Sequence, residues 1–533
     1  MTFIKLTKNI KFISKLFSDE NLTQKATMNA LAAAMDYGAR LLTGFLVTPF
    51  LVSGLGDSLY GVWRTLGNLT GYISAASGRP SQALKWTTAS LQTSTDYAEK
   101  RRNVASALIV WLLFFPFLTT MGGVLVWFAP IWIKDLPVEL YGIVRLAAAL
   151  LVTDMIATTL TVLPQSVLEG ENLGYKRMGL SATLVFVGSG LALLALYLKT
   201  GLVGVAVAEL TTTLLTGLFF LTVVRSYVPW FGLARPSRPM VRSFFGLSGW
   251  FLIWRLVIQL MTASDLVILG VFASTHLVTT YSLTKYVPET LVNLVAIVVF
   301  GITPGLGGII GSGDLKKAAR VRDEIMLLTW LLIIVIGSSI LLWNQAFIRL
   351  WVGPERYAGA IPNFLILILT IQFVLIRNDA NIIDLTLVLS RKVLLGLFSA
   401  SLSVIIAVVL VNFFQAGING LVLGLIAGRL ILSLAYPVMI GRFLGVPLLA
   451  QIKGASRPVL LTVLLFLLAA KLESLWNSSA ISGISWISLA FFVIVTSGIV
   501  FGLAFAFGLR REQQIQIFKR FRMVISKSSS QQK

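Results

Sequence analysis

Long runs of apolar residues, separated by short polar segments, dominate the chain. Runs of roughly twenty apolar residues are long enough to cross the hydrocarbon core of a bilayer as helices. The pattern therefore predicts an all-α polytopic membrane protein with fourteen transmembrane helices, several of them long enough to require tilt or kinks. These spans lie near residues 28–52, 60–78, 104–130, 140–167, 178–198, 202–224, 244–271, 277–309, 325–347, 359–387, 393–414, 418–440, 457–473 and 484–508.

Basic residues in the connecting segments alternate between the two sides of the predicted membrane. The two termini and every second loop hold 32 of the 44 Lys and Arg residues, the other loops hold 5, and 7 lie within the spans. Loops rich in Lys and Arg stay in the cytoplasm. The alternation supports the count of fourteen and predicts that both the N- and the C-terminus are cytoplasmic.

Composition narrows the class further. The chain of 533 residues is 56% hydrophobic and only 12% charged, with a net charge of +22 that the cytoplasmic loops explain without a nucleic-acid partner. It has no cysteine, which excludes disulfides and thiolate metal ligands, and its single histidine, His276, falls in a predicted short outer loop. No phosphate-binding loop, zinc-protease motif or nucleophile elbow is found, so we expect a protein that is not an enzyme.

The N-terminal segment, residues 1–27, is basic and contains an amphipathic stretch without an evident cleavable signal. Its apolar stripe consists of Leu6, Ile10, Ile13 and Phe17. This pattern predicts a helix on the inner membrane surface. The alternative is a frayed basic leader.

Three short patterns recur at nearly constant spacing. Tyr60–Arg64 recurs as Tyr281–Lys285 at an offset of 221, whereas Gly201–Gly204 with Gly417–Gly420 and Trp127 with Trp343 give offsets of 216. We therefore expect two pseudo-symmetric six-helix lobes in the same orientation plus two C-terminal helices, an arrangement typical of transporters that rock two bundles about a central site. The predicted segments are the N-terminal segment (1–27), an N-lobe (28–225), a basic cytoplasmic linker (226–243), a C-lobe (244–442), two further helices (443–509) and a basic cytoplasmic tail (510–533).

Four segments carry a resemblance to a known family: LGDSLYGVW at 55–63, LEGENLGYKR at 168–177, TPGL at 303–306 with GDLKKAAR at 313–320, and FIRLWVG at 347–353. In order and spacing they resemble polysaccharide flippases of the multidrug/oligosaccharidyl-lipid/polysaccharide (MOP) exporter superfamily, over roughly residues 28–442. The long basic N-terminus departs from that pattern. Fourteen spans are more similar to lipid II flippases than to twelve-span O-antigen flippases.

Seven basic residues lie inside the predicted spans: Arg40, Arg64, Arg145, Arg255, Lys285, Arg377 and Arg429. A charge in the bilayer costs a few kcal/mol or more unless it faces a cavity or a partner. Together they predict a hydrated, positively charged interior and an anionic cargo. Arginine suits such a cargo because its forked donors match phosphate oxygens.

The resemblance ranks these cations, because the first, second, seventh and eighth spans line the cleft in the family. It implies that Arg40, Arg64, Arg255 and Lys285 contact the substrate headgroup. Arg40 and Arg255 are expected near the middle of their spans, and the repeat-equivalent Arg64 and Lys285 near the outer mouth. The alternatives are that Arg64 and Lys285 snorkel to the interface and that Arg40 pairs with Asp36, one helical turn away.

The remaining three cations have structural interpretations. Arg145 lies close enough to the outer face to snorkel. Arg377 and Arg429 are expected to pair with the carboxylates of Asp379 or Asp384.

Acidic residues also occur in the spans, namely Asp36, Asp154, Glu209, Asp265, Glu289, Asp379 and Asp384. Buried carboxylates can bind H⁺ or Na⁺ and couple transport to an ion gradient. Asp154 and Glu289 are the preferred candidates by depth, with Asp36 as a third. The alternative is that the acids balance the seven cations. No cofactor is expected, and the driving force is an H⁺ or Na⁺ gradient or the membrane potential.

The resemblance implies a multi-pass protein of the bacterial inner (plasma) membrane with a MATE/MOP-like fold. Such a protein flips undecaprenyl-diphosphate-linked oligosaccharide to the outer leaflet by alternating access, for O-antigen, lipopolysaccharide or other surface polysaccharide biosynthesis. Its expected partners are this lipid-linked substrate, membrane lipids and other polysaccharide-assembly proteins. Two alternatives stay open: a multidrug/cation antiporter of the same superfamily, and a membrane glycosyltransferase or polymerase.

Overall fold

The computed structural model describes residues 22–92, 94–177, 179–385, 389–475, 483–509, 511 and 513–514. Within these ranges the regular structure is entirely helical, as the apolar runs predict. Most of the basic N-terminal segment and the basic tail lie outside the described residues, so the predicted surface helix is not tested. The chain divides into two compact units, residues 1–276 and 277–533. The lobe boundaries expected from the repeat stay a prediction.

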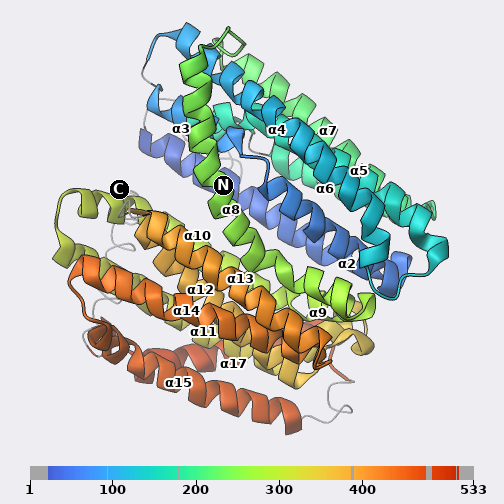
Figure 1. Ribbon diagram of the computed structural model, residues 1–533. Coiled ribbons are helices and arrows are strands. Elements are labelled where there is room, and N and C mark those ends of the chain that lie inside the picture. Colours follow the sequence, from blue (N-terminus) through green and yellow to red (C-terminus); the bar gives the residue numbers. More distant parts are fainter. Residues whose placement is uncertain are drawn as a thin grey trace, which may run out of the picture. The chain divides into compact units, whose positions relative to one another are not determined.

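Unit 1 contains helices that pack side by side, with α5 between α4 and α7 (Figure 1). Its helices are α2 (Leu22–Ala75), α3 (Pro80–Ser90), α4 (Tyr97–Trp132), α5 (Tyr141–Gly170), α6 (Leu180–Tyr197), α7 (Gly201–Tyr227) and α8 (Arg238–Phe272), with the short η1 (Val138–Leu140) and η2 (Gly174–Arg177). The start of α9 (Thr275–Thr284) also belongs to this unit.

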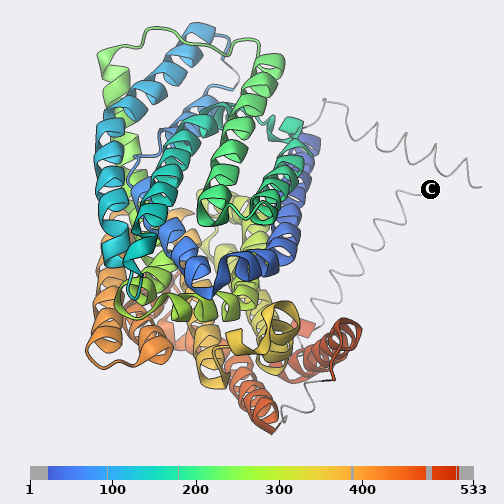
Figure 2. The same cartoon turned by 90° about the vertical axis from the view of Figure 1, so that its right-hand side faces the viewer.

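Helix α2 contains the first two predicted spans in one element. It is interrupted at Gly56, whose φ of 74° and ψ of 164° are non-helical. A side chain at this position would be strained, so glycine permits the change of direction that can be followed in Figure 2. The two parts of α2 before and after Gly56 are called its first and second arms.

Unit 2 contains the remaining helices, α10 (Tyr286–Gly311), α11 (Leu315–Val352), α12 (Ala360–Leu385), α13 (Leu389–Asn412), α14 (Gly417–Leu444), α15 (Leu448–Leu475) and α17 (Trp486–Leu503), with η3 (Pro354–Arg356) and η4 (Ala504–Gly508). The last two predicted spans, α15 and α17, pack on α11. Trp343 of α11 stacks on Phe492 of α17 at 5.4 Å and donates to Thr496 at 3.0 Å. Apolar side chains on the other side of α15 and α17, such as Leu464 and Ile494, are exposed, as lipid-facing residues are.

Twelve helices of the described chain are long and apolar enough to cross a membrane. The predicted number of fourteen is therefore not confirmed and stays a prediction. One of the twelve, Leu31–Ala75, includes two predicted spans joined at Gly56. At the predicted span 277–309 the chain forms two helices, α9 and α10, that separate at Lys285.

Candidate functional site

The second arm of α2 runs antiparallel to α8 in close contact within unit 1, and it also contacts Thr275 at the start of α9. A Cβ added at Gly61 would lie 2.1 Å from the Thr275 carbonyl oxygen, at Gly270 2.5 Å from Thr65 Oγ1, and at Gly71 2.4 Å from Gln259 Nε2. Residue numbers rise along one helix as they fall along the other. This contact therefore sets the register between two helices that carry expected site residues, Arg64 on α2 and Arg255 on α8.

The register separates Arg64 from Arg255. Arg64 adjoins Thr65, which packs on Gly270 toward the Gly56 end of the second arm, whereas Arg255 lies one turn before Gln259, which packs on Gly71. Arg255 is in the middle of α8 but only three residues from the start of the candidate membrane span Leu252–Phe272, so its expected place near the middle of the span is not met. It neighbours the Ala75 end of α2, because α8 extends well past that end. At 1.5 Å per residue, the two arginines lie about 20 Å apart along the helix pair.

Arg64 is partly buried, and its Nε is a buried donor that makes no hydrogen bond to any described residue. The side-chain amide of Asn68, one turn later, donates to the Arg64 carbonyl oxygen at 2.8 Å instead of meeting the guanidinium. An unsatisfied buried donor is costly. The Nε of Arg145 is in the same state, so this feature alone does not distinguish Arg64 as a ligand contact.

Arg40 is exposed on the first arm of α2, and the ion pair that competes with its proposed role is not formed. Asp36 pairs instead with Arg177 at 3.5 Å, and Arg177 also pairs with Glu169 at 3.2 Å. Both partners lie in the 168–177 segment that resembles the flippases. Arg40 also acts electrostatically on Asp36, so Asp36 belongs to an ion network in which Arg177 is its direct basic contact.

The same segment forms a second pair. Lys100 is buried and contacts Glu171 at 2.9 Å, and the Trp230 indole donates to the same carboxylate oxygen at 3.1 Å. The sequence pattern indicated only a resemblance at this loop, whereas the structure shows that its carboxylates hold α4, η2 and the loop after α7 together.

Arg79 lies in the loop between the second and third predicted spans, which the charge alternation predicts to be cytoplasmic. It follows Gly78 directly and has a left-handed backbone, with φ 46° and ψ 53°. Surrounding protein and the nearby positive charge of Arg255 lower the pKa of Arg79 below its usual value. It remains charged at neutral pH because an arginine ordinarily titrates above about 12.

In unit 2, Lys285 lies at the separation between α9 and α10, where Pro288 lacks the N–H that would bond the Thr284 carbonyl. Asn344 of α11 donates to that carbonyl at 3.0 Å and so compensates for the loss. Lys285 pairs with Glu289 at 3.0 Å and lies 5.7 Å from the Tyr281 ring centre. Glu289 is therefore a neighbour of the proposed headgroup contact as well as a proposed coupling acid.

Two other carboxylates of unit 2 pair with residues that the sequence assigned to loops. Asp379 contacts Arg322 at 3.0 Å, with both side chains buried, and Asp384 contacts Lys392 at 2.6 Å. Arg429, one of the two cations expected to pair with these carboxylates, lies over the Phe373 ring at 5.9 Å. Cross-helix pairing of this kind depends on packing, which residue spacing does not show.

Arg145 in unit 1 lies over the Trp127 ring at 4.3 Å. A guanidinium on a tryptophan face is a stable arrangement at a membrane interface. This contact agrees with the structural interpretation of Arg145 and leaves it outside the proposed site.

Asp154 of α5 and Glu209 of α7 lie within electrostatic range of each other, and Thr213 is placed to bond to Asp154. Among the described residues neither carboxylate forms an ion pair with a basic side chain. The sequence proposed Asp154 for ion coupling but did not link it to Glu209.

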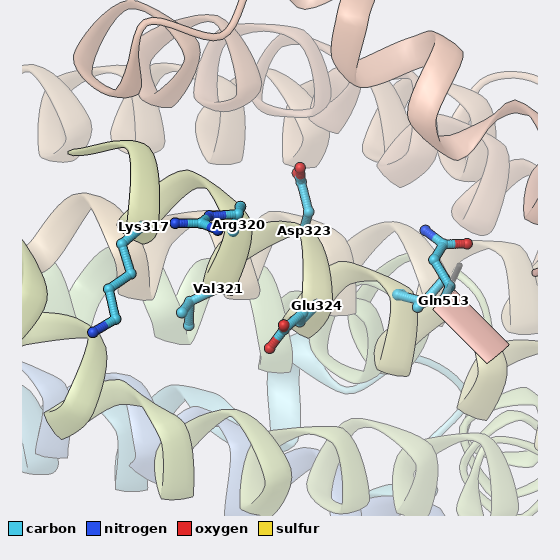
Figure 3. A pocket seen from close by; sticks show the side chains of 7 residues that line it. Lys317, Arg320, Val321, Asp323, Glu324 and Gln513 are labelled. Carbon is cyan, nitrogen blue, oxygen red and sulfur yellow. The ribbon is translucent and has the colours of Figure 1, made fainter. Parts of the chain in front are cut away.

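A cavity of about 370 Å³ lies in unit 2 at the start of α11. It is lined by Lys317, Arg320, Val321, Asp323, Glu324, Leu327 and Gln513. Figure 3 shows the carboxylates of Asp323 and Glu324 pointing in opposite directions from α11. The lining mixes both signs of charge and includes none of the expected site residues, so it does not select an anionic ligand.

Comparison with solved structures shows the fold. An inward-facing multidrug resistance MATE family transporter of the MOP superfamily matches with a TM-score of 0.60 and 15% identity, covering 76% of this chain and 94% of the transporter. An outward-facing one matches with 0.52 and 14%, covering 81% and 97%. A MOP superfamily transporter from Pyrococcus furiosus, described as having a binding pocket of reverse polarity that suggests a different function, matches with 0.53 and 15%, covering 79% and 96%. No family profile and no curated protein matches the sequence. The chain therefore has a MATE-like fold.

Proposed function

We propose that this protein flips undecaprenyl-diphosphate-linked oligosaccharide from the inner to the outer leaflet of a bacterial plasma membrane by alternating access. The observation that carries the proposal is a set of three arginines on membrane helices of unit 1: Arg40, Arg64 and Arg255. Among the described residues none of them forms an ion pair. Lys285 of unit 2 is the fourth proposed headgroup contact.

An anionic cargo is inferred from the free-energy cost of placing these basic side chains in membrane helices. Uncompensated cations in a membrane helix are retained where they face a cavity or a charged partner. A diphosphate is the part of a lipid-linked sugar that cannot cross the bilayer alone, and arginine donors replace its hydration. The resemblance of segments 55–63 and 168–177 to polysaccharide flippases supports this cargo over other anions.

The structural comparisons are consistent with transport and leave the cargo open. Two neighbours are multidrug transporters, whereas the Pyrococcus furiosus neighbour is described by the reversed polarity of its pocket. Similar folds therefore accommodate pockets of different charge. The basic side chains of this chain favour the anionic class.

The second candidate function is a multidrug/cation antiporter, and the Asp154–Glu209 pair favours it. Two carboxylates without a basic partner attract a cation or a proton. In the flippase this pair would bind the coupling ion, with Glu289 and Asp36 as the alternative coupling acids. The two functions therefore differ in which charged group contacts the cargo.

The test is export of surface glycan in a strain whose own copy of the gene is deleted. Arg40→Ala, Arg255→Ala and the double variant Arg64→Ala/Lys285→Ala should abolish surface glycan at normal membrane levels, whereas the control Arg145→Ala should retain it. Normal glycan in all three would reject the proposal. Loss of drug resistance in Asp154→Asn and Glu209→Gln, with glycan unchanged, would establish the antiporter instead.

A further inference from the structure

We propose that Arg79 and Arg255 together form the receiving site at the inner face, where the diphosphate of the lipid-linked substrate first binds. The inference rests on the proposed function and adds Arg79 to its headgroup contacts. It also predicts the order in which the headgroup meets the cations of unit 1, with Arg79 and Arg255 before Arg40 and Arg64.

Helix register brings the two arginines together. In the contacts Gly61–Thr275, Thr65–Gly270 and Gly71–Gln259, residue numbers rise along α2 and fall toward the start of α8. Beyond the last contact, α2 leads to Arg79 and α8 leads back to Arg255. The electrostatic influence of Arg255 on Arg79 agrees with this register.

The turn between α2 and α3 holds Arg79 in place. Gly78 has φ 69°, and a Cβ added there would lie 2.4 Å from the Phe114 ring. Phe114 of α4 in turn stacks on Phe245 of α8 at 5.6 Å. The turn is thus fixed against α4, which packs on the helix that carries Arg255.

Two features of Arg79 point to a ligand. Its left-handed backbone is disfavoured for a residue with a side chain, and such outliers cluster at binding sites. The Arg79 charge also lies within electrostatic range of the like charge of Arg255, and an anion between two such groups relieves their repulsion.

The position suits the first step of transport. At 1.5 Å per residue, the second arm of α2 from Gly56 to Ala75 rises about 28 Å, close to the thickness of the roughly 30 Å hydrocarbon core. Arg79 lies just beyond its inner end, in the loop that the charge distribution assigns to the cytoplasm. By the same measure, Arg40 and Arg64 lie about 24 and 12 Å from the outer turn. A headgroup that enters at Arg79 therefore meets cations at successive depths.

The ligand that fits this pair is a diphosphate monoester with a lipid tail. Two separate guanidinium groups provide forked donors for two phosphate groups. A monophosphate or the phosphodiester of a bulk lipid supplies a single group and would engage one arginine.

The experiment measures binding to the purified full-length chain in detergent by native mass spectrometry. The ligands are undecaprenyl diphosphate, undecaprenyl monophosphate and phosphatidylglycerol. The decisive variant is Arg79→Gly, because glycine adopts the left-handed backbone without strain while removing the charge. Lys199→Gly is the matched control, since Lys199 is also an exposed basic residue with a left-handed backbone, at φ 55°.

We expect Arg79→Gly to weaken diphosphate binding about tenfold or more, as the loss of charge-assisted hydrogen bonds implies, with an unchanged or higher melting temperature. Arg79→Lys should fall between this variant and the wild type, and Lys199→Gly should bind normally. Equal diphosphate binding by Arg79→Gly and the wild type overturns the receiving site but not the proposed function. Equal weakening of phosphatidylglycerol binding overturns it as well, because the pair would then be a general lipid contact. If the wild type does not prefer the diphosphate over phosphatidylglycerol, the proposed function itself fails.

Discussion

Lys285 and Glu289 form an ion pair of 3.0 Å where α9 and α10 separate, whereas Arg64, which corresponds to Lys285 in the predicted repeat, has Asn68 four residues later. The two corresponding positions thus both carry a basic side chain, but only one of them has an acidic partner. The lysine of unit 2 is partly neutralised, and the arginine of unit 1 is not. Glu289 is half-exposed, so the pair can open when a stronger anion arrives.

Glu289→Gln should release Lys285 from its partner. We expect undecaprenyl diphosphate to bind more tightly by up to about fivefold, since an exposed ion pair contributes at most about 1 kcal/mol. The measurement is a binding titration with the purified protein. In the Lys285→Ala background the same substitution should have no effect, and an equal gain in both backgrounds would show that Glu289 does not act through Lys285.

Asn344→Leu should destabilise the protein by about 1–3 kcal/mol, because it leaves the buried Thr284 carbonyl without a donor. The loss is read from chemical or thermal unfolding in detergent. In the Pro288→Ala background residue 288 supplies an N–H to that carbonyl, so the cost of Asn344→Leu should shrink. Equal costs in the two backgrounds would contradict the assigned cause of the helix break.

Asp379→Asn should reduce stability by about 3–5 kcal/mol, because it leaves the buried Arg322 guanidinium without its counter-charge. Both side chains are at most 5% exposed. Arg102→Ala is the control: it removes an exposed pair of 3.7 Å to Asp96 and should change stability by less than about 1 kcal/mol. Similar unfolding curves for the two variants would show that the Arg322–Asp379 pair is not buried in the membrane protein.

Single-cysteine variants can test the orientation directly, because the chain contains no cysteine. A membrane-impermeant thiol reagent applied to intact cells or spheroplasts should label Lys199→Cys and Glu355→Cys from outside. Arg79→Cys should react only in inverted vesicles, since the charge distribution places its loop in the cytoplasm. External labelling of Arg79→Cys would reverse the predicted orientation and, with it, the role of Arg79 as an entry site.

The amino-acid sequence by itself determined that this is a polytopic helical membrane protein. Apolar runs of about twenty residues are unfavourable in contact with water and span a bilayer as helices. The charge alternation gave an expected orientation, and the cations inside the spans, such as Arg40 and Arg64, indicated an anionic cargo. These signals are local or compositional, so they do not require knowledge of packing.

Tertiary structure alone decided which charges meet. Asp36 lies one turn from Arg40 yet pairs with Arg177, which is 141 positions away, and Asp379 pairs with Arg322 from another helix. By its position in the sequence Arg79 is a loop residue, and only the register of α2 against α8 brings it near Arg255. The physical reason is the same in each case: the energy of a charge depends on distances of a few ångströms, and helix packing, not sequence spacing, sets those distances.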